Sequence, residues 1–148
     1  MNTEFKNPRS VPHPNNGTEW LYYFSHRLWV HGHKRTAKIV KHVNSLIFRS
    51  FIDPQAQIGK RLELPHGGFG VVINGDTIIG DDAIIFHNVT IANGGTKIGD
   101  RVYIGTGVAI IGSLTIGDDV TIGANTTVNF DIPSGATVVG SLGRFVVR

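Results

Sequence analysis

Aliphatic residues recur every six positions through most of the chain beyond residue 52, and polar residues and glycines fill the positions between them. The longest unbroken run comprises Ile98, Ile104, Ile110, Ile116, Ile122 and Val128, and shorter runs precede it at Ile58 and Leu64 and at Ile73, Ile79, Ile85 and Ile91. A six-residue repeat is typical of a parallel β-helix, in which three short strands form one triangular coil and the aliphatic side chains fill its axis. The pattern therefore predicts a mainly β fold, a parallel β-helix of about four and a half coils.

The residues before the repeat follow a helical period instead. Trp20, Phe24, Leu28 and His31 lie at helical spacing after Thr18, which is a candidate N-cap, and Gly32 interrupts them. A second helix is predicted from about residue 34 to residue 50, and its apolar stripe consists of Ile39, Val40, Val43, Leu46 and Ile47. The aromatic residues of the first helix follow the stripe that we expect to face the core.

These patterns divide the chain into four parts. The predicted parts are an irregular arm at residues 1–17, a helical lead-in at 18–51, the β-helix at 52–133 and a C-terminal segment at 134–148. The arm contains three prolines and an Asn-Asn-Gly triplet, which disfavour regular structure. Stacked coils leave unpaired backbone groups at both ends, so we expect the lead-in and the C-terminal segment to cover them.

The six-residue rhythm is broken between Leu64 and Ile73. The next core positions after Leu64 would be residues 70 and 76, but these are Gly70 and Asp76, and the pattern resumes at Ile73. Three extra residues have therefore been inserted within the stretch LPHGGFGVVI. Glycine tolerates positive φ and carries no side chain, so the insertion is expected to bulge outward and to let a ligand approach the backbone.

Two histidines lie beside this insertion when the coils are counted with the slip. The strand of Ile85 is then stacked directly on the strand of Leu64, and His66 and His87 each follow their core residue by two positions. We therefore expect both side chains on the same face, one coil apart. A histidine on a rigid strand is suited to act as a general base, because the ordinary pKa of imidazole lies near neutral pH.

The motifs around this break resemble those of the hexapeptide-repeat acyltransferases. The stretches IDPQAQIG, LPHGGFGVVI and FHNVTI are similar to elements of the serine O-acetyltransferases and of the small exopolysaccharide O-acetyltransferases in that group. The resemblance implies a left-handed β-helix, a homotrimer with active sites between subunits, and acetyl-CoA as co-substrate. It also implies that His66 takes the proton of an acceptor hydroxyl as that oxygen attacks the thioester directly, with no covalent acyl-enzyme.

The resemblance assigns further site residues by position. It places His87 in the acceptor cleft, and it implies that CoA is contacted at stacked corners by Ala92, Asn93, Thr106 and Ala124. The C-terminal stretch GSLGR is similar to the end of the family that contacts CoA, with Arg144 directed toward phosphate. The implied CoA site therefore runs along the corners of several coils.

Several positions depart from the serine acetyltransferases and bear on the acceptor. The Asp that orients the base in that family corresponds to Phe51 here, and Asp53 is the candidate to replace it. The Asp before the base is Pro65, and residues 92–96 are too short to form the family's loop with a second histidine. We therefore expect a hydroxyl of a sugar or polysaccharide precursor as acceptor. The alternatives are serine O-acetylation in cysteine biosynthesis and a non-catalytic trimeric scaffold.

Charge is distributed unevenly along the chain. Residues 1–51 hold eight Lys or Arg and two Glu, whereas residues 52–148 hold six basic and nine acidic residues. The predicted second helix carries Lys34, Arg35, Lys38 and Lys41. Such a basic stretch is typical of a solvated helix face. The alternative is a surface that binds an acidic partner or an anionic membrane, and glycan acceptors can be lipid-linked. We expect no nucleic-acid binding, because the helix carries no recognition motif.

Other classes of site and location are limited by composition. The chain contains no cysteine, so disulfides and thiolate metal sites are excluded. Its first residues lack the apolar core of a signal peptide, and no apolar run approaches the length of a membrane span, so we expect a cytoplasmic protein. A metal-dependent hydratase built on the same repeat needs three converging histidines, and residues 52–148 supply only His66 and His87. We therefore expect no metal.

Overall fold

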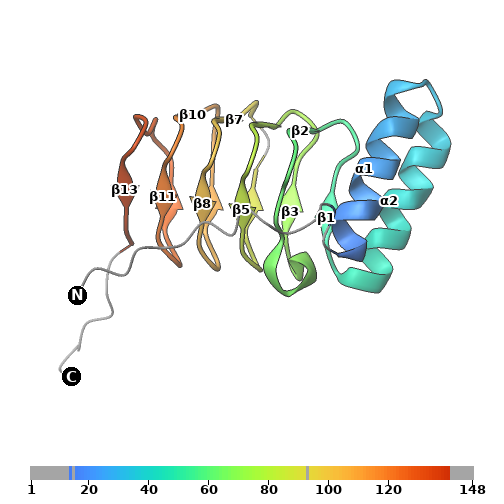
Figure 1. Cartoon of the computed structure of the whole chain (residues 1–148), viewed down its shortest axis with the longest axis horizontal. Helices are drawn as coiled ribbons and strands as arrows, with labels where there is room; N and C mark the ends of the chain where they lie inside the picture. The colour runs from blue at the N-terminus through green and yellow to red at the C-terminus, as the bar shows by residue number, and fades with distance from the viewer. Residues whose placement is uncertain (1–13, 15, 93, 141–148) are drawn as a thin grey trace.

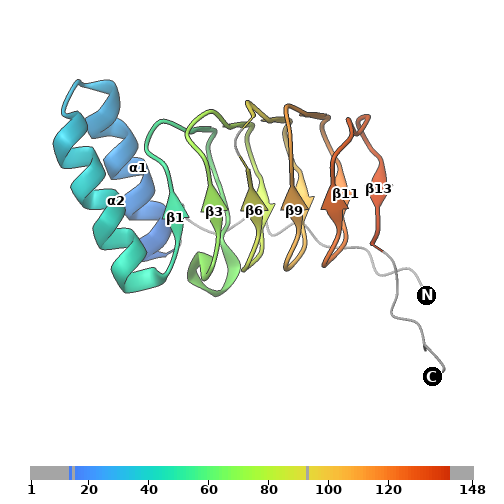
Figure 2. The same cartoon turned by 180° about the vertical axis from the view of Figure 1, so that it is seen from behind.

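The computed structural model describes residues 14, 16–92 and 94–140 of the chain. Two helices, α1 (Gly17–Val30) and α2 (Lys34–Phe48), form a hairpin at one end of a parallel β-helix (Figure 1, Figure 2). Most of the predicted arm lies outside the described residues. Within the predicted C-terminal segment, residues 134–140 are described, and they carry the last strand, β13 (Thr137–Val138).

Short strands of two residues each form three parallel sheets. The first sheet has the order β1-β3-β6-β9-β12 (Phe51–Ile52, Val72–Ile73, Thr90–Ile91, Ala109–Ile110 and Thr127–Val128). The second has the order β2-β4-β7-β10 (Gln57–Ile58, Ile78–Ile79, Lys97–Ile98 and Thr115–Ile116). The third has the order β5-β8-β11-β13 (Ile84–Ile85, Tyr103–Ile104, Thr121–Ile122 and Thr137–Val138). The three sheets form the sides of a prism whose coils stack along its length (Figure 1).

The strand register confirms the six-residue repeat. Ile73 pairs with Ile91, and Ile110 pairs with Val128, each three repeats apart, so successive coils place their aliphatic residues in columns. The side chains of these residues are fully buried, as are those of Ile85 and Ile104 in the third sheet. Full burial of one aliphatic side chain stabilises a fold by about 1.5–3 kcal/mol. The columns are therefore the core of the molecule, and they confirm the predicted mainly β, parallel β-helix fold.

Helix α1 is capped by Asn16. The side-chain oxygen of Asn16 accepts the N–H of Glu19 at 3.1 Å, which satisfies one of the free donors of the first turn. Thr18, the predicted N-cap, is instead the second residue of the helix, and its side chain is buried against the β-helix. The predicted N-cap is therefore wrong. Asn and Thr are both good N-caps, so the local sequence does not distinguish Asn16 from Thr18. The hydroxyl of Thr18 instead donates to the carbonyl of Gly67, a residue far away in the sequence.

Helix α1 turns a different face to the core from the one that its apolar pattern predicts. Trp20 and Phe24 are 55% and 42% exposed, whereas Tyr22 is buried. The hydroxyl of Tyr22 donates to the carbonyl of Ala56 at 2.8 Å and accepts the N–H of Ile58 at 3.2 Å. The end of a β-helix presents unpaired backbone groups, which a tyrosine hydroxyl satisfies and a purely apolar side chain cannot. The aromatic stripe therefore lies on the surface.

The apolar stripe of α2 is also on the surface. Ile39 and Leu46 are 63% and 77% exposed, while Ala37 and Asn44 are buried. The side chain of Asn44 donates to the carbonyl of Thr18 at 3.2 Å. Small and polar residues therefore join the two helices to each other, and the stripe that the sequence predicts as apolar faces outward.

Candidate active site

The inserted residues form a turn that projects from the corner between the third and first sheets (Figure 1). This turn is the short 3-10 segment Pro65–Gly68, in which His66 and Gly67 have φ values of 60° and 69°. A positive φ is uncommon outside glycine and asparagine, and it persists where surrounding contacts offset its cost. The side chain of His66 is exposed. The register break therefore presents a histidine to solvent on a constrained turn.

The first turn of α1 holds this bulge in place. The hydroxyl of Thr18 donates to the carbonyl of Gly67 at 2.6 Å. The carboxylate of Glu19 accepts the N–H of Leu64 at 2.8 Å, and the side-chain amide of Asn16 donates to the carbonyl of Leu64 at 3.0 Å. Backbone groups on both sides of the histidine are therefore fixed by the helix. Sequence reasoning misses these contacts, because they join residues separated by more than 40 positions.

His66, His87 and Thr106 form a row along this corner, which we call the His66 edge. The ring centroids of His66 and His87 lie 5.1 Å apart, and the two rings are inclined at 86°. Nδ1 of His87 lies 3.4 Å from the hydroxyl oxygen of Thr106 in the next coil. The structure confirms that the two histidines share a face one coil apart. Two imidazole rings and a hydroxyl thus provide proton donors and acceptors at one place.

Two aromatic residues that the sequence pattern does not single out border the His66 edge. The ring centroid of Phe86 lies 6.3 Å from that of His66, and the ring centroid of Tyr103 lies 5.2 Å from that of Phe86. Both residues are partly exposed on the outer side of the third sheet. An aromatic residue at an outward position of the repeat is the only sequence signal that could have identified them. Phe86 therefore gives His66 an apolar neighbour on one side, and Tyr103 packs against Phe86.

Asp53 lies at a different corner from His66. It follows β1 at the corner between the first and second sheets, whereas His66 precedes β3 at the corner between the third and first sheets. Its carboxylate forms an ion pair with Lys41 at 3.0 Å and accepts the N–H of Gln55 at 3.0 Å. The ammonium group of Lys41 also lies 4.5 Å from the ring centroid of Phe51. Within the described residues, Asp53 therefore joins α2 to the first coil and is not brought to His66.

The residues implied to contact CoA fall on two corners. Thr106 and Ala124 follow β8 and β11 on the His66 edge, where Ala124 is exposed. Ala92 follows β6 at the corner between the first and second sheets. Asn93 and Arg144 lie outside the described residues. Ala124 beside Thr106 is small and exposed, so a ligand lying along the stacked corners can reach the backbone groups there and form hydrogen bonds with them.

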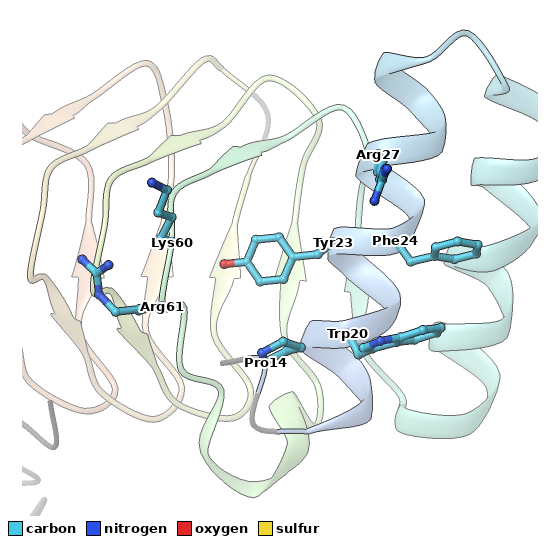
Figure 3. A pocket seen from close by; sticks show the side chains of 7 residues that line it. All are labelled: Pro14, Trp20, Tyr23, Phe24, Arg27, Lys60 and Arg61. Carbon is cyan, nitrogen blue, oxygen red and sulfur yellow. The ribbon is translucent and has the colours of Figure 1, made fainter. Parts of the chain in front are cut away.

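A cavity of about 700 Å³ lies between α1 and the corner that joins the second and third sheets (Figure 3). It is lined by Pro14, Trp20, Tyr23, Phe24, Arg27, Lys60 and Arg61. Within it, the hydroxyl of Tyr23 donates to the carbonyl of Gly59 at 2.7 Å, and Arg61 is held by Asp82 at 2.6 Å. Neither histidine of the His66 edge lines this cavity. We therefore place the candidate active site on the His66 edge, where the register break and the titratable groups coincide.

The described part of the chain carries neither a cluster of metal ligands nor a membrane-spanning helix. Among residues 14, 16–92 and 94–140, no group of three or more His, Cys, Asp or Glu side chains could hold a metal ion. Neither α1 nor α2, the helices of that part, has the length and apolar character needed to cross a membrane.

The repeat region matches two related protein families. Residues 95–129 match the family described as bacterial transferase hexapeptide (six repeats), and residues 76–111 match the hexapeptide repeat of succinyl-transferase. Among curated proteins, a serine acetyltransferase of Helicobacter pylori is 38% identical to this chain over 138 residues. That match covers 86% of this chain and 78% of the relative, so the similarity includes the helical lead-in as well as the repeat.

Solved structures of serine acetyltransferases share the fold. The enzyme of Neisseria gonorrhoeae in complex with serine is 35% identical, with a TM-score of 0.79 over 84% of this chain and 53% of that one. A serine acetyltransferase in complex with CoA is 31% identical, with a TM-score of 0.80 over 87% of this chain and 55% of that one. This chain therefore spans about half the length of these solved relatives.

Proposed function

Because the chain belongs to the hexapeptide-repeat acyltransferase family, we propose that it transfers an acetyl group from acetyl-CoA to a hydroxyl of a small acceptor, with His66 as general base. One observation carries the proposal. His66 is exposed on a braced break in the repeat, and its ring lies 5.1 Å from that of His87. A coil that served only as a scaffold would need no such break.

The proposed reaction is a direct transfer. A ring nitrogen of His66 accepts the proton of the acceptor hydroxyl while the hydroxyl oxygen attacks the carbonyl carbon of the thioester. A C–O bond forms, the carbonyl electron pair moves to oxygen, and backbone N–H groups stabilise the resulting oxyanion. The C–S bond then breaks, and the departing sulfur takes the proton from His66 to give CoA and the acetyl ester. No covalent acyl-enzyme is required.

L-Serine is the first acceptor candidate. The curated relatives that match 86% of this chain are named serine acetyltransferases, and one similar solved structure is a complex with serine. The named relatives therefore favour serine over the sugar hydroxyl expected from the sequence. A sugar hydroxyl is the second candidate, and one observation supports it: Asp53 is held by Lys41 away from His66, and Pro65 precedes the base. Within one subunit, among the residues that the structure describes, neither acidic group that the resemblance implies for serine lies at His66.

We also infer a homotrimer whose subunits complete one another's sites. Thr106 and Ala124 lie on the His66 edge, whereas Ala92 lies at the corner between the first and second sheets, and this separation supports a ligand bound between two subunits. Ala92 and Asn93 of a neighbouring subunit would contact CoA from the other side, with Arg144 directed toward a phosphate. His87 faces the acceptor in this arrangement. A cytoplasmic location, where acetyl-CoA is available, fits this reaction.

Release of free CoA from acetyl-CoA tests the proposal, with L-serine compared with a panel of sugars and oligosaccharides. His66→Asn is the informative variant, because asparagine tolerates a φ near 60° but cannot act as the base. His42→Asn changes an exposed histidine of α2 and is the matched control. We expect one acceptor class to support release, and His66→Asn to lower it by about 10²–10⁴-fold.

Two results would overturn this proposal. Full turnover by His66→Asn would remove His66 as the base. No release with any acceptor, from a protein that is folded by circular dichroism, would favour the non-catalytic scaffold.

A further inference from the structure

The helical hairpin carries an exposed apolar surface that the proposed reaction does not use. We call this surface the distal face. It consists of Trp20, Phe24, Ile39, Val43, Leu46 and Ile47. Each is a large apolar residue, and Leu46 is the most exposed at 77%. Large contiguous apolar patches on a soluble protein mark places where a partner or a membrane binds. The distal face is therefore a candidate docking surface.

Trp20 and Phe24 lie at the edge of the distal face, because they also line the cavity between α1 and the corner of the second and third sheets. Figure 3 shows Trp20 and Phe24 extending to the far side of α1, whereas Tyr23 points toward the coils. The rings of Trp20 and Phe24 are stacked, with centroids 5.4 Å apart. They therefore form one continuous aromatic surface on α1.

On α2 the orientation follows from Lys41, which is turned toward the β-helix by its ion pair with Asp53. Successive residues of an α-helix are separated by about 100° around the axis. Ile39, Val43 and Leu46 consequently lie on the side of α2 opposite Lys41. Both helices thus contribute to the outer end of the described part of the chain, opposite the end that carries β13 (Figure 1).

Cations border this surface on both helices. Arg27 lies one turn from Phe24 on α1, Arg35 lies one turn from Ile39 on α2, and both are exposed. Lys34, Lys38 and Arg49 are exposed as well. The one carboxylate in the sequence of the two helices, Glu19, is fully buried against the β-helix. The exposed side chains of the hairpin thus combine an apolar stripe with positive charge and no negative charge.

We propose that the distal face docks the protein on an anionic lipid bilayer. An amphipathic helical surface with Trp, Phe and Leu on one side and Lys or Arg beside them binds at the boundary between headgroups and acyl chains. Anionic headgroups attract the cations, and the apolar residues enter the layer beneath them. Residues 52–148 carry more acidic than basic residues, so anionic headgroups repel the β-helix. The protein therefore contacts the bilayer through its helical end.

A second copy of the chain fits the distal face less well. Two copies meeting through this surface would bring Arg27 and Arg35 of one near the cations of the other, with no exposed carboxylate on the helices to neutralise them. The repulsion disfavours such a pair, whereas a bilayer supplies the missing negative charge.

Flotation of the full-length protein with lipid vesicles tests the inference. Vesicles of phosphatidylcholine alone are compared with vesicles of phosphatidylcholine mixed with phosphatidylglycerol. We expect binding to the anionic vesicles only, weakened by added salt because screening shortens the reach of the cations. Replacement of Arg35 or Lys38 by Gln should each lower the partition coefficient about fivefold. Lys97→Gln, an exposed change on β7, is the matched control and should bind as the original protein does.

Apolar variants separate a bilayer from a second copy. Ile39→Ser and Leu46→Ser change exposed side chains, so the fold is expected to persist while flotation is lost. Absence of flotation with anionic vesicles at low salt, or equal flotation of the Arg35, Lys38 and Lys97 variants, would overturn the proposal. So would a halving of the mass in light scattering for Leu46→Ser without loss of vesicle binding, because the surface would then join two assemblies of this chain.

Discussion

The hydroxyl of Thr18 donates a hydrogen bond of 2.6 Å to the carbonyl of Gly67, the residue that follows His66 in the bulge. The two residues are 49 positions apart, and Thr18 is fully buried. One side of the hairpin therefore helps to set the position of the proposed base, while its other side carries the distal face. A change in the first turn of α1 is thus expected to reach the active site without touching a substrate.

Thr18→Val tests whether this hydrogen bond positions His66. Valine keeps the shape of threonine and removes the donor, so the free energy of unfolding should fall by about 1 kcal/mol. We expect kcat for CoA release to fall while KM for acetyl-CoA changes little, because the proposed CoA contacts, Thr106 and Ala124, lie on other coils. Urea denaturation and steady-state kinetics measure the two effects.

Two further variants control this experiment. Thr18→Ser retains the hydroxyl and should restore kcat. Thr127→Val changes an exposed threonine of β12 and should alter neither quantity. An unchanged kcat in Thr18→Val, despite lower stability, would show that the bond supports the fold and not the base.

Glu19 is expected to stabilise the bulge through its acceptor oxygen. It is fully buried, and it accepts the N–H of Leu64 at 2.8 Å and the side-chain amide of Asn16 at 2.9 Å. Glu19→Ala would leave the buried N–H of Leu64 without an acceptor, which costs about 1–3 kcal/mol. Glu19→Gln keeps an acceptor oxygen and should lose less. Equal losses of unfolding free energy in the two variants would contradict this explanation.

The repeat and the pairing of His66 with His87 could be predicted because both depend on local spacing. A period of six fixes which side chains fill the axis, and the slip of three residues fixes which strands stack. Counting along the chain was therefore sufficient to place two residues of different coils side by side. The fold needed no information about distant contacts.

The orientation of the helices and the role of Asp53 could not be predicted in the same way. A helical period identifies an apolar stripe, but it does not reveal whether that stripe packs against the protein core or faces a lipid bilayer. At the open end of the first coil, the hydroxyl of Tyr22 donates to the carbonyl of Ala56. This contact turns Tyr22 toward the β-helix and leaves Trp20 and Phe24 exposed. Asp53 likewise pairs with Lys41, which lies 12 residues earlier on α2. The sequence pattern does not show which side of α2 faces the β-helix, so this ion pair could not be predicted.

Tyr22 is expected to make the fold sensitive to alkaline pH. Burial raises the pKa of its hydroxyl well above the ordinary value of 10, and the N–H of Ile58 partly opposes that rise. Between pH 10 and the folded pKa, the unfolded chain releases this proton while the folded chain retains it. The associated stability is therefore complete below pH 10 and is lost as the pH rises above it.

Tyr22→Phe should be less stable at neutral pH, because the carbonyl of Ala56 loses its donor, but its stability should fall less steeply above pH 10. Burial also raises the pKa of Tyr23 to about 12, so Tyr23→Phe should flatten part of the same slope. Urea denaturation at a series of pH values from 8 upward, over the range in which the protein stays folded without urea, measures how steeply the free energy of unfolding falls with pH in each variant. An unchanged slope in Tyr22→Phe would exclude this tyrosine as the cause.

Adjacent glycines of the bulge provide a matched pair of substitutions. Gly67 and Gly68 have φ values of 69° and 67°, so alanine is strained at either position, at a cost of about 1 kcal/mol. A Cβ at Gly67 would meet no heavy atom within 4 Å. A Cβ at Gly68 would lie 3.1 Å from a methyl group of Leu64 and 3.3 Å from the methyl group of Thr18.

Gly68→Ala should therefore cost about 1–3 kcal/mol more than Gly67→Ala, because two packed side chains must move in addition to the backbone strain. Since Thr18 is one of them, its hydrogen bond to Gly67 should be disturbed, and kcat should fall further in Gly68→Ala than in Gly67→Ala. Urea denaturation and CoA release on the two variants test both expectations. If Gly67→Ala were the more damaging change to kcat, the freedom of the backbone beside His66, and not its support from α1, would govern the site.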